Sequence, residues 1–337
     1  MKLAEGTRKV LITGGAGYVG TRLVRKLIGL DIEVVVVDTF WYGMDVFKDL
    51  KNSKNLKLIK MDIRDVDSLE KEFRNVDAVI HLACISNDPS YDLNPNLGKS
   101  INFDCFEPIV KAAKQNGVSR FIYASSSSVY GVKQEDNVTE VLSLEPLTDY
   151  SKFKAMCEPI LFEYSDENFC TTVLRPATVC GYSERQRLDL SVNILTNYAI
   201  NKGFIRVFGG EQLRPNLHIE DMCDAYLNVL GQDQDKVNLE IFNVGGKNLS
   251  LMEIAVTVRD KINKDLEIVQ EESNDLRSYK VNSDKIKDRL NFSPKKNVSD
   301  AIEDLKIAFK NGKLPNSFDD SIYFNLKRMS EIFENKI

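Results

Sequence analysis

Histidine is scarce in this 337-residue chain, which contains only His81 and His218. A histidine-rich metal site is therefore not expected, and we assign no metal to the protein. The cysteines show no C-x-x-C spacing, so a disulfide framework is not expected either. We expect reduced thiols and a cytoplasmic protein. The six cysteines are Cys84, Cys105, Cys157, Cys170, Cys180 and Cys223.

Long apolar runs and an excess of positive charge are also missing. Residues 1–8 are polar, and the apolar run after them is too short for a signal peptide or a membrane span, so we expect a soluble protein without a membrane partner. The net charge of −5 argues against nucleic acid as a partner. The chain also has no internal repeat and no low-complexity linker. Its length suits one large α/β domain with a smaller appended one.

A glycine-rich turn between a strand and a helix is the strongest local signal. Residues 10–12 form an apolar run typical of a buried parallel strand, and residues 18–30 carry apolar side chains at helical spacing. Between them, Gly14, Gly17 and Gly20 stand where the turn is tight, where backbone approaches a ligand and where helix packs on strand. Free amides at the helix start predict a phosphate or pyrophosphate site; the alternative is a glycine-rich loop without a ligand.

A carboxylate follows at the end of the next strand. Residues 33–38 read EVVVVD, and Asp38 lies about 20 residues beyond the glycines, where a dinucleotide fold places the group that binds the adenosine ribose. The alternative is a solvated aspartate at a strand end. Residues 39–42 contain no lysine or arginine to meet a 2′-phosphate, so the sequence favours NAD over NADP.

Strands and helices continue to alternate, which predicts an α/β fold with a doubly wound parallel sheet, the Rossmann architecture. Asp62 follows the third strand, where it either reaches the adenine or caps the following turn. His81 lies inside an apolar strand and is interpreted as a core histidine. Pro108 predicts a kink or break in its helix. We expect strands at 55–60, 77–83, 120–125 and 170–174, helices at 66–73, 99–115 and from 149, and a loop at 87–98.

The alternation loosens after about residue 180, which predicts a smaller mixed α/β domain that binds substrate. We expect short strands at 204–208, 217–219, 240–244 and 266–269, and helices near 188–202, 220–231, 250–263 and 297–310. The predicted division is a dinucleotide-binding domain at 1–180, a substrate domain at 181–316 and a C-terminal helix at 317–337. Within 181–316 the chain is allowed to return to the dinucleotide-binding domain. The C-terminal helix is amphipathic and is expected to pack on the body or on a neighbouring subunit.

Polar residues at two later points form a candidate catalytic group. A serine tract begins at Ser125, directly after a predicted strand, and strand ends of parallel sheets are where ligand chemistry is built. Tyr150 and Lys154 are four residues apart and share one helical face. A polar loop and a surface contact are the simpler interpretations of each feature alone. Their combination with the glycine turn and Asp38 is specific.

Ordered motifs along nearly the whole chain resemble the extended short-chain dehydrogenase/reductase family, in particular its nucleotide-sugar epimerases and dehydratases. The motifs are TGGAGYVG at 13–20, Asp38, MDIRD at 61–65, HLAC at 81–84, INFD at 101–104, SSSSVYG at 125–131, YSKFK at 150–154, LRPATVCG at 174–181 and RPNLHIED at 214–221. The resemblance implies a catalytic triad of Ser126, Tyr150 and Lys154. It implies NAD binding by Gly14, Gly17, Tyr18, Val19, Gly20, Asp38, Asp62, Ile63, Leu82, Ala83, Asn102, Ser125, Tyr150, Lys154 and Pro176. For the nucleotide-sugar it implies Thr178, Asn193, Arg214 and Arg277.

Two departures from the family pattern bear on the reaction. Ser127 and Ser128 stand where the 4,6-dehydratases carry an acidic pair and where the decarboxylases use a glutamate, so neither chemistry has its extra carboxylate. Of two arginines that often bind the diphosphate, the first position is Glu272 and the second is Arg277. Arg187, in a polar stretch on the substrate side, is a candidate to compensate.

The resemblance therefore predicts an NAD-dependent nucleotide-sugar epimerase. Tyr150, as phenolate, would remove a proton from a sugar hydroxyl at C4, with Lys154 lowering its pKa and Ser126 bonding the same oxygen. A dehydrogenase that releases the keto sugar and a non-catalytic NAD-binding regulator are the alternatives. The sugar and the nucleotide base stay open. A homodimer is expected through the helices near 99–115 and 149–166, paired across a two-fold axis.

Overall fold

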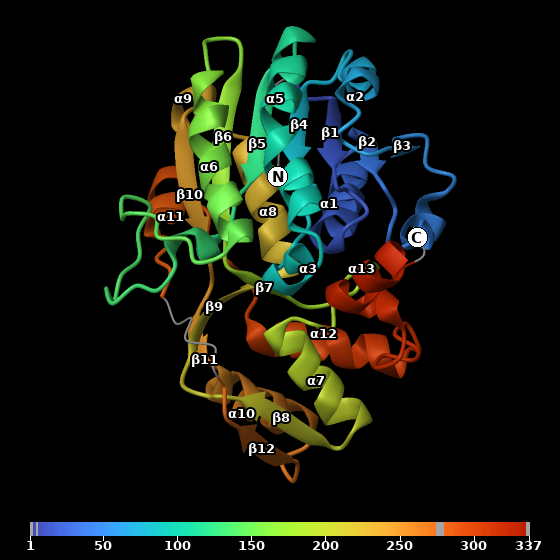
Figure 1. Cartoon of the computed structure of the whole chain (residues 1–337), viewed down its shortest axis with the longest axis vertical. Helices are drawn as coiled ribbons and strands as arrows, with labels where there is room; N and C mark the ends of the chain where they lie inside the picture. Colours follow the sequence, from blue (N-terminus) through green and yellow to red (C-terminus); the bar gives the residue numbers. More distant parts are fainter. Residues whose placement is uncertain (1–2, 5, 274–279, 335–337) are drawn as a thin grey trace.

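A seven-stranded, fully parallel sheet forms the centre of the larger part of the molecule (Figure 1). The computed structural model describes residues 3–4, 6–273 and 280–334. The strand order is β10-β6-β5-β4-β1-β2-β3, so the direction of winding reverses between β1 and β4. The strands are β1 (Lys9–Thr13), β2 (Glu33–Asp38), β3 (Leu56–Lys60), β4 (Ala78–His81), β5 (Arg120–Ala124), β6 (Cys170–Pro176) and β10 (Glu240–Val244). In such sheets ligands bind at the carboxyl ends of the strands beside the reversal.

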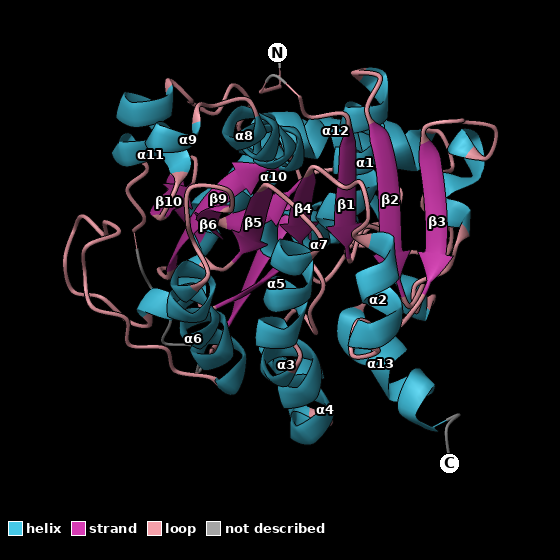
Figure 2. Cartoon of the chain, turned by 90° about the horizontal axis from the view of Figure 1, so that it is seen from above, coloured by secondary structure: helices cyan, strands magenta, loops and turns pink. Residues whose placement is uncertain are grey.

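Helices cover both faces of this sheet because consecutive strand residues point to opposite sides (Figure 2). Val34 and Val36 belong to one apolar core, and Val35 and Val37 belong to the other. The first core packs against α1 (Tyr18–Gly29), α8 (Ile219–Leu230) and α11 (Asp284–Leu290). The second packs against α2 (Val66–Glu72), α3 (Asp88–Asp92), α5 (Phe106–Gln115), α6 (Asp149–Glu163) and α13 (Asn325–Glu334).

A smaller α/β region lies beyond the carboxyl ends of the large sheet (Figure 1). It has its own apolar core, formed mainly by α7 (Ser191–Asn201), α10 (Leu251–Ile262), α12 (Val298–Lys310), β8 (Phe204–Phe208) and β12 (Glu267–Glu271). A three-stranded sheet of β7 (Thr178–Cys180), β9 (Leu213–His218) and β11 (Asn248–Ser250) lies between the two parts. The remaining short elements are η1 (Asp45–Leu50), α4 (Pro95–Lys99), η2 (Ser100–Asp104), η3 (Ser127–Tyr130), α9 (Gln234–Val237) and η4 (Ser321–Tyr323).

The predicted loop at 87–98 is wrong, since it folds into the short helices α3 and α4. The side chain of Asn87 accepts a hydrogen bond from the Ser90 amide, the side chain of Asn94 accepts one from the Leu97 amide, and each helix has a proline in its first turn. The same residues that suggested a loop therefore act as helix starts.

The helix expected at 99–115, with the kink or break that Pro108 implied, is confirmed in part, because helical structure runs to Gln115 and is interrupted at Cys105. Its first part is the π-helical turn η2, and α5 begins only at Phe106. Pro108 lies in the first turn of α5, where a proline removes no intrahelical hydrogen bond, so the change of helix type precedes it.

Strand β10 corrects the placement of residues 240–244, which were expected in the smaller domain. It pairs with β6 along its whole length, from Glu240 opposite Thr172 to Val244 opposite Pro176. Helix α8 likewise packs on α1. The chain thus returns to the large sheet after visiting the smaller region, and the exact domain boundaries stay a prediction. No helix in the described part of the chain is long and apolar enough to cross a membrane.

Candidate active site

A cavity of about 690 Å³ opens at the carboxyl ends of the strands, where the strand order reverses, and reaches toward the smaller region. It brings together residues that the sequence analysis selected from across more than 200 positions. Those that line it are Gly14, Gly17, Tyr18, Val19, Gly20, Asp38, Asp62, Ile63, Leu82, Ala83, Ser125, Ser126, Tyr150, Lys154, Pro176, Thr178, Arg187 and Arg214. Asn102 and Asn193 lie outside its lining, and Arg277 lies outside the described residues.

The glycine turn fits the pyrophosphate of a dinucleotide. Gly14 has φ +72°, and a Cβ there would lie 2.6 Å from the Ala83 nitrogen. At Gly20 a Cβ would lie 2.5 Å from the Gly15 oxygen, so helix α1 reaches the turn only because this residue has no side chain. Helix α1 begins without a side-chain cap at Gly17, which leaves its first amides for a ligand.

Asp38 lies beside this turn and is tied to it by hydrogen bonds. Its carboxylate accepts from the Ala16 amide at 3.0 Å and from the Phe40 amide at 2.8 Å. Burial raises the pKa of Asp38, and these hydrogen bonds oppose the rise. The carboxylate is thus fixed at the cavity wall, which suits the predicted ribose contact.

Asp62 serves the turn after β3 while also lining the cavity. Its carboxylate accepts from the Arg64 amide at 3.0 Å and from the Arg64 guanidinium at 2.6 Å. The capping interpretation is therefore realised, and adenine binding stays a prediction. His81 is buried, with Nδ1 2.9 Å from the Thr13 hydroxyl, which confirms it as a core histidine.

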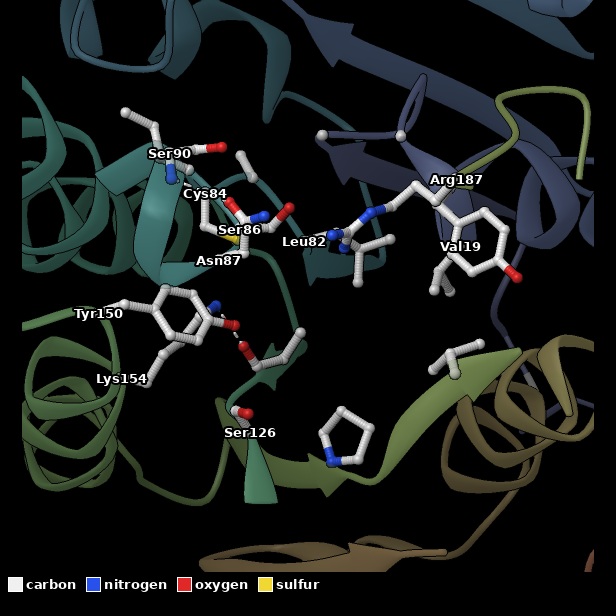
Figure 3. A pocket seen from close by; sticks show the side chains of 18 of the residues that line it. Val19, Leu82, Cys84, Ser86, Asn87, Ser90, Ser126, Tyr150, Lys154 and Arg187 are labelled. Atoms are coloured by element: carbon white, nitrogen blue, oxygen red, sulfur yellow. Dashed lines mark hydrogen bonds between the residues drawn. The ribbon is translucent and has the colours of Figure 1, made fainter. Parts of the chain in front are cut away.

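Ser126, Tyr150 and Lys154 meet on one side of the cavity, and Figure 3 shows Arg187 and Val19 on the opposite side. Lys154 Nζ donates to the Ala124 carbonyl at 2.6 Å, and it lies 6.0 Å from the centre of the Tyr150 ring. Burial is the main cause that raises the pKa of Tyr150, and the charge of the nearby Asp88 carboxylate adds to the rise. Hydrogen bonding with Ser126 and the charge of Arg187 lower it.

The serine tract folds back on itself as η3, which orients Ser126. The Ser126 hydroxyl accepts from the Ser128 amide at 3.1 Å and from the Ser128 hydroxyl at 2.9 Å. Ser127 is buried. The tract therefore offers hydroxyl groups and no carboxylate next to Tyr150.

A buried ion pair beneath the catalytic group was missed from the sequence. Arg175 donates to Glu158 twice, at 3.0 and 2.6 Å, and Ser125 donates to the same carboxylate at 2.5 Å. Tyr130 and Asn243 continue the network, with the Tyr130 hydroxyl 2.8 Å from Arg175. The signal was available in part: Glu158 follows Lys154 by four residues and so extends the helical face that carries it. The arginine on β6 had no local signal.

Asn193 joins the glycine turn to the smaller region. Its amide oxygen accepts from the Gly181 amide at 3.0 Å, and its nitrogen donates to the Tyr18 hydroxyl at 3.0 Å. Tyr18 in turn donates to the Gly181 carbonyl at 2.6 Å. Asn102 has a comparable structural place, because its side chain makes two hydrogen bonds to the Ile85 backbone. Ligand contacts by Asn102 and Asn193 stay predictions.

Two arginines after β7 face the cavity, and only Arg187 was selected from the sequence. Arg187 makes a two-point ion pair with Asp189, at 2.9 and 3.2 Å. Arg185 is also buried and lines the cavity, with its guanidinium carbon 3.6 Å from the centre of the Tyr42 ring. Residue 329 of the C-terminal helix lines the same cavity. Among the described residues, no group of three or more His, Cys, Asp or Glu side chains is arranged to hold a metal.

Comparison with known proteins gives consistent matches. A sequence model of the NAD dependent epimerase/dehydratase family matches residues 10–245. UDP-glucose 4-epimerase from Lactobacillus helveticus is 28% identical over 318 residues, which cover 87% of this chain and 94% of the relative. UDP-glucuronic acid decarboxylase 1 from Arabidopsis thaliana is 27% identical over 317 residues, covering 90% of this chain and 70% of the relative.

Solved structures agree with the fold. UDP-glucuronic acid 4-epimerase from Bacillus cereus, determined with UDP-glucuronic acid and NAD, superimposes with a TM-score of 0.80 at 25% identity. The superposition covers 90% of this chain and 99% of that protein. These matches include proteins with different reactions on nucleotide-sugars, so the reaction itself has to be argued from the site.

Proposed function

This chain belongs to the NAD-dependent epimerase/dehydratase family, and from that premise we propose that it is a nucleotide-sugar epimerase acting through a transient 4-keto sugar. The observation that carries the proposal is the meeting of Ser126, Tyr150 and Lys154 in the cavity that also holds the glycine turn and Asp38. Ser127 and Ser128 occupy the positions where dehydratases and decarboxylases of the family carry carboxylates, and this favours epimerisation over water loss or decarboxylation.

Tyr150 acts as the base on the C4 hydroxyl. NAD, when bound by the glycine turn and Asp38, would supply the acceptor and donor for the hydride of C4. Ser126, whose hydroxyl is held by Ser128, bonds the same sugar oxygen and passes the proton to Tyr150. The ammonium of Lys154 favours the phenolate form of Tyr150, which burial opposes. In the epimerase, the keto sugar turns over before the hydrogen returns to its other face.

Binding roles follow from the sides of the cavity. The first amides of α1 are assigned to the cofactor pyrophosphate and Asp38 to the adenosine ribose. Because a 2′-phosphate would meet the Asp38 carboxylate, NAD is expected to bind more than about tenfold tighter than NADP, a difference above about 1.4 kcal/mol. Titration of both cofactors against Trp41 fluorescence measures this, and equal affinities would overturn the ribose assignment. Thr178, Arg187 and Arg214 are assigned to the nucleotide-sugar.

The deciding experiment uses UDP-glucose, UDP-glucuronic acid and dTDP-glucose, each carrying deuterium at C4. The epimerase is expected to give a C4-epimeric product that keeps its deuterium, without accumulation of NADH, because the transferred hydrogen never meets water. NADH in equal amount to a released keto sugar supports the dehydrogenase instead. If the protein binds NAD but converts none of the three sugars, the result supports the non-catalytic regulator. Either this outcome or the release of a keto sugar with NADH rejects the epimerase.

Tyr150→Phe is the matching variant. It is expected to lower turnover at least about 100-fold, as is typical for loss of a general base, while NAD affinity stays within about twofold. Full activity in this variant would contradict the assigned base.

A homodimer is the proposed assembly, with α5 and α6 pairing with their copies across a two-fold axis. Light scattering is expected to report twice the 38.2 kDa chain mass, and the chain mass alone at micromolar concentration would contradict it. The six cysteines are all free thiols, which supports a reducing, cytoplasmic setting.

A further inference from the structure

Arg185 is a buried cation that forms no ion pair within the described part of the chain. The residue is 3% exposed, and among the described residues no carboxylate oxygen lies within ion-pair distance of its guanidinium, although the charges of Asp189 and Asp38 act on it from farther away. Its Nε–H likewise has no hydrogen-bond partner in that part of the chain. Burial lowers the pKa of Arg185 to about 10, so the guanidinium keeps its charge at neutral pH. Neighbouring Arg187 differs, because Asp189 pairs with it.

The C-terminal helix α13 holds this guanidinium in place. The Asn325 side-chain oxygen accepts from Arg185 Nη2, and its side-chain nitrogen donates to the Ser86 hydroxyl at 3.0 Å. The backbone amide of Asn325 donates to the Asp189 carboxylate at 3.0 Å. Farther along α13, Arg328 donates to the Trp41 carbonyl at 2.7 Å. One short helix thus contacts three loops of the cavity rim, and it lies outside the region matched by the family model.

A buried cation with an unused donor is costly unless an anion completes it. Arg185 lines the cavity together with Asp38 and Gly17, and its charge acts on Asp38. Two anionic groups of a dinucleotide come into question, the pyrophosphate and a 2′-phosphate. The Asp38 carboxylate disfavours a 2′-phosphate, whereas the glycine turn beside it is built for the pyrophosphate.

We propose that Arg185 is a cofactor-binding residue that donates to the pyrophosphate of NAD, and that Asn325 is a positioning residue that fixes the Arg185 guanidinium against the Tyr42 ring. The C-terminal helix thereby completes the cofactor site from outside the dinucleotide-binding motif. The proposal rests on the NAD binding that the proposed function requires, and it is independent of whether the bound protein epimerises, dehydrogenates or regulates.

The test separates the parts of the cofactor. Affinities for NAD, ADP-ribose, adenosine and NADP are measured by calorimetry, with adenosine by competition, in the wild type and in Arg185→Gln, Arg185→Lys and the surface control Arg259→Gln. Loss of a charge-assisted hydrogen bond to the pyrophosphate is expected to weaken NAD and ADP-ribose equally, by about 10- to 100-fold, and to leave adenosine unchanged. Arg185→Lys is expected to fall between, and Arg259→Gln to match the wild type.

Three outcomes overturn the assignment. Equal weakening of adenosine and NAD means that Arg185 only supports the fold of the cavity. Unchanged NAD affinity means that it binds another group. Tight NADP binding by the wild type that only Arg185→Gln abolishes identifies a 2′-phosphate site instead.

Asn325 has its own matched set. Asn325→Leu removes the acceptor and is expected to weaken NAD and ADP-ribose about three- to tenfold while adenosine is unchanged. Asn325→Gln keeps an uncharged amide that can accept from Arg185 and donate to Ser86, and it is expected to restore most of the affinity. Ser330→Ala, on the exposed side of α13, controls for changes in the helix itself. Failure of Asn325→Gln to restore binding, with Asn325→Leu still folded, contradicts the positioning role.

Discussion

Replacement of Lys154 by Met tests how Tyr150 becomes a base. Lys154 Nζ lies 6.0 Å from the centre of the Tyr150 ring. If this distance is taken as the separation of the ammonium from the phenolate charge, with an effective dielectric of about 20, the expected stabilisation of the phenolate is about 3 kcal/mol, or about two pKa units. The methionine side chain is uncharged and similar in length to that of lysine. The substitution therefore removes the ammonium charge while the shape of the cavity is retained.

The sign of the effect follows from the role of Tyr150. The reaction needs the phenolate, so turnover rises with pH up to the pKa of Tyr150 in the loaded enzyme. Removing the cation raises that pKa, and in Lys154→Met the rising limb is expected to move about two units to higher pH. At pH values below the pKa of Tyr150 in the wild type, turnover of Lys154→Met is then expected to be about 100-fold lower than that of the wild type. At high pH the turnover of the variant is expected to recover.

The assay is the initial rate at saturating substrate and NAD from about pH 6 to about pH 10. Lys152→Met is the control, because Lys152 lies on the same helix, has half its side chain exposed and forms a surface ion pair with Asp149. A Lys154→Met profile with the limb at the wild-type pH and a uniformly lower rate would refute the reasoning, since the lysine would then act without tuning Tyr150.

Three further predictions concern stability, measured as the free energy of unfolding in urea. Gly20→Ala is expected to lower the free energy of unfolding by about 1–3 kcal/mol, because the new Cβ would lie 2.5 Å from the Gly15 oxygen. The control is Gly29→Ala on the same helix, where a Cβ would meet open space, and it is expected to raise the free energy of unfolding by up to about 1 kcal/mol. Equal effects of the two substitutions would contradict the close approach at Gly20. Glu158→Ala strands the Arg175 guanidinium in the interior and is expected to cost about 3–5 kcal/mol, and a cost below about 1 kcal/mol would show that the pair is dispensable. Burial lowers the pKa of His81 to about 3, so the unfolded chain binds one proton more than the native one between about pH 6.5 and about pH 3, and stability falls by about 1.4 kcal/mol per pH unit as the pH drops through this window. His81→Phe is expected to lessen that slope by one proton, and an unchanged slope would assign the acid sensitivity elsewhere.

The sequence predicted most of the cofactor half of the site and less of its surroundings. The glycine turn, Asp38 and the catalytic group were found because each lies at a strand end or a helix start, where local spacing alone places a residue at the ligand edge. The loop at 87–98 was missed because asparagine and proline serve both loops and helix starts, and only the packed structure shows which applies.

Distant partners had no such signal. Residues 240–244 read as a strand, but their place beside β6 depends on the route of the chain through the smaller region. Arg175 and Glu158, which are 17 positions apart in the chain, form a pair because β6 and α6 pack together. Neither pairing can be predicted from the local spacing of apolar residues.

By itself, the sequence predicted the parallel α/β fold and the glycine turn, and it selected the serine, tyrosine and lysine of the candidate catalytic group, because helical and strand periods and glycine spacing act over a few residues. Tertiary structure alone decided which groups complete the cavity: Arg185 meets Asn325 across 140 positions, and Met329 of the C-terminal helix lines the cavity. The physical reason is that a buried charged or polar group needs a hydrogen-bond partner. Tertiary packing determines which acceptor lies within hydrogen-bond distance, and that acceptor can be far away in the sequence.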